Sequence, residues 1–214
     1  MDYADSLEQM LTGQIDMARF VSLLKSDAGL REYLGKLIPQ DAIFDPQHPL
    51  WHKNSRIYYA ENDFDLLKVL QSRHRFDNSI DDNLNIFSII SRVYRCCRPD
   101  LPYTSRYEEE ADLYLEIADD YFESPEVKPV LEQIVREIVS IKPRFKRRKE
   151  IKRKVKSAFH VSGNNLPCWI QNPEWPMGKK SPMQFVNQSE AEDGVEYLFR
   201  DVDTGETRLI AQYD

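Results

Sequence analysis

The helical part of the fold is clearest in one stretch, Ser124-Pro125-Glu126-Val127-Lys128-Pro129-Val130-Leu131-Glu132-Gln133-Ile134-Val135-Arg136-Glu137-Ile138-Val139. Its apolar residues recur at spacings of three and four, which is typical of a helix that buries one face. Pro125 suits the first helical position, where its missing N–H costs nothing. The stretch therefore predicts an amphipathic helix that starts at residues 124–126.

Similar patterns predict helices elsewhere in the chain. They include a short helix that ends at Gly13 and helices over residues 16–25, 28–38, 63–73, 81–97 and 106–123, with a loop over 41–50. Asp81 and Asp82 are expected at the amino end of the helix 81–97, both as caps and for their favourable interaction with the helix dipole. The apolar residues on most faces of this helix predict a place in the core. A thin apolar stripe that includes Phe145, Ile151 and Val155 extends the helical prediction to the block 142–156.

The chain changes character after Gly163. Four prolines between residues 167 and 182 exclude a long helix. Residues 195–202 and 207–213 predict a β-hairpin, and 183–188 a possible third strand. The predicted fold class is mainly α: a bundle-like helical body, residues 1–160, with residues 161–214 packed on it in a single domain. Trp169 and Trp175 are interpreted either as a structural clasp between body and hairpin or as anchors for a partner.

The chain is acidic overall but contains one basic block. The whole chain carries a net charge of −7, whereas residues 142–156 alone carry +9. The candidate nucleic-acid-binding residues in this block are Lys142, Arg144, Lys146, Arg147, Arg148, Lys149, Lys152 and Arg153. Such residues neutralise phosphates, but a basic helix in an acidic protein is more often a solvated face that pairs with acidic neighbours, and a protein partner is a further alternative.

An acidic stripe is predicted on the helix 106–123. At about 100° per residue, five carboxylates fall within an arc of roughly 80°; they are Glu109, Asp112, Glu116, Asp119 and Glu123. This pattern indicates either a solvated helix face or a surface that attracts a basic partner.

The residues predict neither catalysis nor a cofactor. No nucleophile motif or phosphate-binding glycine loop is present. The four histidines and three cysteines lack metal-ligand spacing, and Cys168 is interpreted as a structural thiol. No apolar run approaches the roughly 20 residues needed to cross a bilayer, and the acidic start lacks a signal-peptide pattern. We therefore expect a soluble cytoplasmic protein that is not an enzyme, with no catalytic, metal-binding or cofactor-binding residues.

Four stretches together resemble bacterial immunity proteins of contact-dependent growth inhibition and related polymorphic-toxin systems. They are residues 30–39 (Leu30-Arg31-Glu32-Tyr33 onward), 81–87 (Asp81-Asp82-Asn83-Leu84 onward), 169–179 (Trp169-Ile170-Gln171-Asn172 onward) and 199–206 (Phe199-Arg200-Asp201-Val202 onward). The resemblance implies an inhibitor that binds one cognate toxin domain, often a nuclease, and occludes its active site. A nuclease has a basic substrate cleft, which the acidic stripe would complement. The alternative is a nucleic-acid-associated regulator that uses the block 142–156.

Overall fold

The structure is a computed structural model that describes residues 3–37, 78–118, 122 and 124–213. The chain divides into two compact units, Met1–Glu108 and Glu109–Asp214. The boundary expected at residue 160 lies inside the second unit. The helix predicted over 63–73 and the loop predicted over 41–50 lie outside the described residues.

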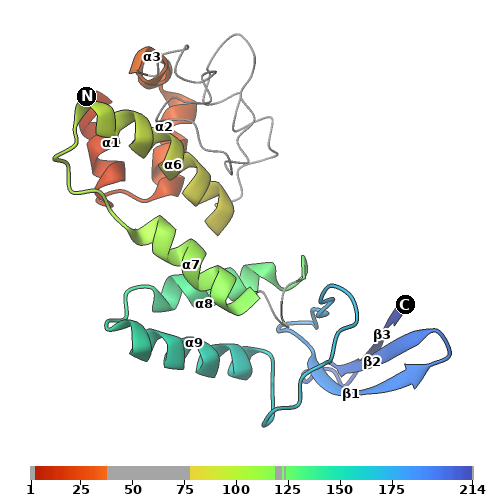
Figure 1. Cartoon of the computed structure of the whole chain (residues 1–214). Helices are drawn as coiled ribbons and strands as arrows, with labels where there is room; N and C mark the ends of the chain where they lie inside the picture. Colours follow the sequence, from red (N-terminus) through yellow and green to blue (C-terminus); the bar gives the residue numbers. More distant parts are fainter. Residues whose placement is uncertain (1–2, 38–77, 119–121, 123, 214) are drawn as a thin grey trace. The chain divides into compact units, whose positions relative to one another are not determined.

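The first unit is helical in its described part (Figure 1). It contains α1 (Tyr3–Leu11), α2 (Met17–Ser26), α3 (Ala28–Leu37), α6 (Ile80–Cys97) and the first turn of α7 (Arg106–Ala118). Leu7, Phe20 and Phe87 are fully buried in its core. The amphipathic patterns of the sequence place these side chains on facing helix surfaces, so the core follows from the periodicity.

Helix caps fix where two of these helices begin. The Asp16 side chain accepts a hydrogen bond from the Arg19 N–H at 2.8 Å and starts α2. Ser79 caps α6 by accepting from the Asp82 N–H at 3.2 Å. The prediction that Asp81 and Asp82 cap this helix was wrong; they lie in its first turn, where carboxylates still interact favourably with the helix dipole.

The second unit combines helices with a sheet. It holds most of α7, then α8 (Lys128–Ile138) and α9 (Arg144–Ala158). An antiparallel sheet follows, in the order β1 (Gln184–Ala191), β2 (Gly194–Arg200) and β3 (Thr207–Tyr213). The hairpin and the third strand predicted from the sequence are confirmed. The fold class is confirmed only in part, because the described residues form a mixed α and β structure.

The start of α8 differs from the prediction. The helix begins at Lys128, and the side chains of the preceding residues bind the C-terminal segment. The Ser124 hydroxyl donates to the Trp175 carbonyl at 2.6 Å. Glu126 accepts two hydrogen bonds from the Arg208 guanidinium at 3.0 Å each. The residues expected to open the helix therefore tie it to the sheet.

An aromatic cluster forms the core of the second unit. Trp175 is fully buried, with its ring centroid 5.0 Å from that of Phe159 and 5.4 Å from that of Phe199. Its indole N–H donates to the Met183 carbonyl at 2.8 Å. Trp169 stacks on Phe199 at 5.9 Å. The Trp-rich segment is thus a clasp between helices and sheet, and Trp175 has no exposed surface to offer a partner.

In the part of the chain that the structure describes, no helix is both long and apolar enough to cross a membrane.

Candidate binding surfaces

Two of the three described members of the acidic stripe on α7 are bound to arginines within the second unit. Glu109 accepts a hydrogen bond from Arg147 at 2.6 Å. Glu116 accepts two from Arg148, at 3.2 and 2.9 Å, and raises the pKa of that guanidinium. Asp112 is exposed. The remaining two members of the predicted stripe, Asp119 and Glu123, lie outside the described residues.

The basic block separates into paired and unpaired cations. Besides Arg147 and Arg148, which bind carboxylates of α7, Arg153 binds Glu150, and Lys154 binds Glu137. These bonds lower the pKa of both carboxyls. The interpretation that the block pairs with acidic neighbours is therefore confirmed for these four cations.

The other lysines of the block are exposed and have no carboxylate partner among the described residues; they are Lys142, Lys146, Lys149, Lys152 and Lys156. Arg144 is the first residue of α9. The prediction that Phe145 is part of a buried stripe was wrong, since 68% of its surface is exposed, whereas Ile151 and Val155 are buried as expected.

A second acidic surface, not recognised in the sequence, lies on the β1–β2 hairpin. Four carboxylates surround its turn: Glu190, Glu192, Asp193 and Glu196. None of the four has an ion-pair or hydrogen-bond partner among the described residues. The sequence does contain a signal for this surface, because no Lys or Arg occurs between Lys180 and Arg200. We call these four carboxylates the acidic hairpin.

The sheet face next to the acidic hairpin carries exposed apolar side chains. Tyr213 pairs with Gly194 beside the turn and is 61% exposed. Leu209 is 54% exposed and pairs with Leu198. Residues two apart on a strand share a face, so Tyr213, Leu209 and Glu196 are on the outer face. The opposite face carries the buried aromatic cluster.

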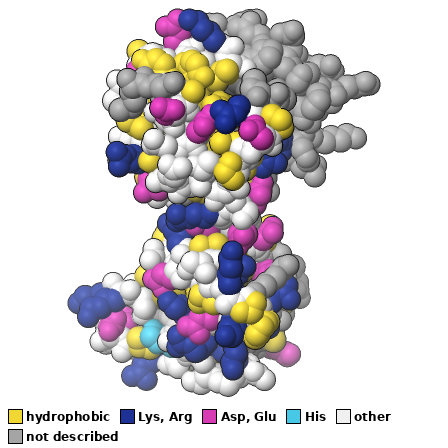
Figure 2. All heavy atoms as spheres, turned by 90° about the vertical axis from the view of Figure 1, so that its left-hand side faces the viewer, with side chains coloured by type: hydrophobic (Ala, Val, Ile, Leu, Met, Phe, Trp, Pro, Cys, Tyr) yellow, Lys and Arg dark blue, Asp and Glu magenta, His cyan; other side chains and the backbone are white. Residues whose placement is uncertain are grey.

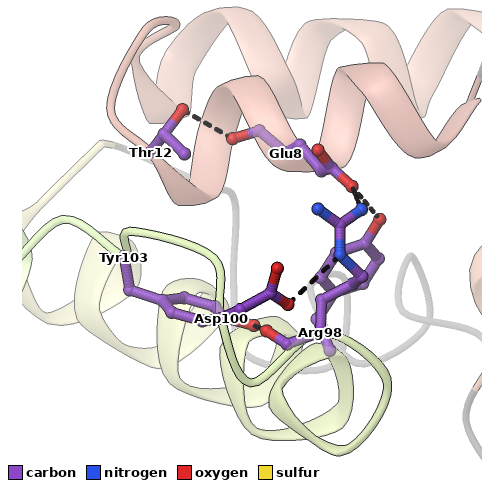
Figure 3. Close-up of polar contacts among 6 residues, drawn as sticks. Glu8, Thr12, Arg98, Asp100 and Tyr103 are labelled. Carbon is purple, nitrogen blue, oxygen red and sulfur yellow. Dashed lines mark hydrogen bonds and ion pairs between the residues drawn. The ribbon is translucent and has the colours of Figure 1, made fainter.

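A polar cluster joins α1 to α6 in the first unit (Figure 3). Glu8 accepts hydrogen bonds from Tyr94, at 3.0 Å, and from Arg98. Arg98 also contacts Asp100 at 3.5 Å. Burial, and then the Glu8 carboxylate, raise the pKa of Tyr94. The groups satisfy one another, so the cluster is a structural connection rather than a site for a ligand.

A hollow of about 590 Å³ lies between the 177–183 and 201–208 segments. Asp201 on its wall accepts backbone hydrogen bonds from Lys179 at 2.7 Å and Asp203 at 2.8 Å, which lower its pKa. Arg208 on the same wall is held by Glu126. Asp201 and Arg208 are therefore already held by other protein groups, and the hollow does not present them together to a ligand.

One Ser–His contact has the residue types of a catalytic pair. His160 Nε2 lies 3.0 Å from the Ser181 hydroxyl. In the described part of the chain no carboxylate binds the other ring nitrogen, and neither residue lines the hollow. A nucleophile of this kind needs an oriented base, which this contact does not supply. Among the described residues, no group of three or more His, Cys, Asp or Glu could hold a metal ion.

Comparison of the chain with protein-family models, with curated proteins and with solved structures gave no match.

Proposed function

We propose that this chain is an immunity protein that binds a cognate bacterial toxin domain and blocks its active site. The observation that carries the proposal is the acidic hairpin, four carboxylates without an ionic partner in the described structure, beside the exposed Tyr213. The resemblance described for the sequence supports the same class of protein. The surface differs from the one first predicted, because Glu109 and Glu116 are bound to arginines of α9.

The charge of the hairpin suits a basic partner. A nuclease domain gathers lysines and arginines where it binds phosphates. Free carboxylates on the inhibitor accelerate the encounter with such a cleft and suppress wrong partners. Carboxylates already bonded to arginines contribute less, because their field is largely cancelled. The hairpin is therefore the better match for a toxin with a basic substrate cleft.

The sheet supplies the apolar part of the interface. Interfaces have an apolar centre and a polar rim, and buried tyrosines are frequent anchors. Tyr213 and Leu209 provide exposed apolar area on the face that also carries Glu196. Seven paired positions with β3 hold β2 in place. A preformed strand surface loses little conformational freedom on binding, which favours affinity.

The proposal is tested by mixing the purified chain with the toxin domain encoded beside its gene. We expect a one-to-one complex by light scattering and loss of the toxin's nuclease activity at equimolar inhibitor. Tyr213→Ala should weaken the complex by about tenfold to a hundredfold, since anchor residues contribute about 2 kcal/mol or more. Ile170→Ala, at another exposed position outside this face, is the control. A complex that forms equally well with both variants would exclude this sheet face.

A further inference from the structure

The exposed face of α9 carries lysines that the proposed function does not use. At about 100° per residue, four residues fall within an arc of about 60°; they are Phe145, Lys149, Lys152 and Lys156. Lys146 extends the arc to about 120°. Ile151 and Val155 occupy the other side of the helix and are buried. Arg153 falls in the same arc but is bound to Glu150, so we call Phe145 and the four lysines the lysine face.

The positive charge of the lysine face is not neutralised within the described structure. Four carboxylates pair with cations of α9, and none of them is held by a lysine of the lysine face; these pairs are Glu109–Arg147, Glu116–Arg148, Glu137–Lys154 and Glu150–Arg153. Lys156 donates to the Gly163 carbonyl at 2.9 Å, which leaves its charge in place. Figure 2 shows Lys and Arg side chains gathered on unit 2, with some acidic side chains among them.

The acidic character of the whole chain does not cancel this local charge. Exposed charges separated by more than about 10 Å are largely screened at 0.1 M salt. The lysines of α9 repeat along one face, and like charges at such spacings repel one another. A polyanion laid along the helix would relieve that repulsion and release its own counterions.

The exposed ring of Phe145 indicates which class of polyanion fits this face. Its ring is 68% exposed, although aromatic side chains are normally buried. It precedes Lys156 by 11 residues, about 16 Å along the helix. Exposed aromatics beside a row of cations are the pattern with which proteins bind single strands, because unpaired bases stack on the ring while the phosphates follow the charges. A duplex or an acidic protein has no base free to stack.

From this arrangement we infer that the lysine face of α9 binds single-stranded nucleic acid, with the phosphates on Lys146, Lys149, Lys152 and Lys156 and a base on Phe145. The lysines contact phosphates only, so the binding has little sequence preference. This site is separate from the acidic hairpin. Either one can fail its test without affecting the other.

The test is fluorescence anisotropy of a labelled oligothymidylate titrated with the full chain at several salt concentrations. Four phosphate contacts predict that log K falls with log salt with a slope of about −3, since each contact contributes about 0.7 on a single strand. Lys149→Gln with Lys152→Gln should reduce the slope to about −1.4. Phe145→Leu should lower affinity about tenfold and leave the slope unchanged.

The control is the double variant Lys179→Gln with Lys180→Gln. It removes the same charge from two exposed lysines outside α9, so it should bind like the wild type. Equal loss in both double variants would show a nonspecific effect of net charge and overturn the inference. Absence of binding at about 50 mM salt would also overturn it. The same holds if duplex DNA or polyglutamate competes as well as the single strand.

Discussion

Removing the charge of Glu109 tests whether the predicted acidic stripe is part of the structure or a free surface. Glu109→Gln keeps the shape of the side chain but leaves the Arg147 guanidinium without its carboxylate. Arg147 keeps 11% of its side-chain surface accessible, and Glu109 keeps 34%. Arg147 also donates to the Val139 carbonyl at 3.2 Å, which holds it in place when the carboxylate is lost.

The expected cost follows from this burial. Breaking a fully buried pair costs about 3–5 kcal/mol, because a charge is left unpaired, whereas an exposed pair contributes about 0.2–1 kcal/mol. With one partner buried and the other one-third exposed, we expect Glu109→Gln to lower the free energy of unfolding by about 1.5 kcal/mol. Adding Arg147→Met should recover part of that loss, because the stranded charge is removed as well.

Urea denaturation followed by circular dichroism measures these differences. Glu108→Gln is the matched control, since Glu108 precedes Glu109 on the same helix and is exposed. Its free energy of unfolding should stay within about 0.5 kcal/mol of wild type, as is usual for surface substitutions. If Glu109→Gln lowers the free energy of unfolding no more than Glu108→Gln does, the ion pair does not stabilise the fold. In that case α7 is again a candidate docking surface.

Three further predictions concern the second unit. Trp175→Ala should cost about 3–5 kcal/mol of stability, measured by urea denaturation, because it empties the centre of the aromatic cluster; an unchanged midpoint would contradict that role. Gly194→Ala should destabilise the fold by about 1–3 kcal/mol and weaken the toxin complex, because an added Cβ would lie 2.0 Å from the Gln212 carbonyl oxygen; wild-type stability would show that the hairpin tolerates the change. The Asp201 carboxyl has a pKa lowered below its ordinary value of 3.8, so it stabilises the fold above about pH 4, and this stabilisation is lost as the pH falls through the lowered pKa. In a pH series of urea melts, Asp201→Asn should lose less stability below about pH 4 than the wild type does. Parallel stability curves for the two proteins would refute this prediction.

Local sequence patterns were sufficient to predict most of the described helices and strands. The spacing of apolar residues placed α2 and α6, and the content of β-forming residues placed the three strands of the sheet. These patterns did not predict that the side chains of Ser124 and Glu126, which precede α8, bind Trp175 and Arg208, which are far away in the sequence. Local capping rules contain no information on such distant partners.

The same limit applies to the binding surfaces. Helix geometry correctly placed Glu109 and Glu116 on one face of α7, but not the arginines of α9 that bind them. Phe145 lies on the other side of α9 from Ile151, so the apolar residues of this helix do not form one buried stripe. The acidic hairpin could have been found from its run of carboxylates without a single Lys or Arg. Pairing across distant elements decides which charges remain available.

The most direct test of the proposed function compares two charge-matched double variants in their association with the toxin domain. Glu192→Gln with Asp193→Asn changes the acidic hairpin, and Glu108→Gln with Asp112→Asn changes exposed carboxylates of α7. A carboxylate about 4 Å from a cation gains about 1 kcal/mol in water. At low salt we therefore expect the hairpin variant to associate about tenfold more slowly and the α7 variant to match wild type. A slow α7 variant with a normal hairpin variant, or equal rates for all three, would contradict the account.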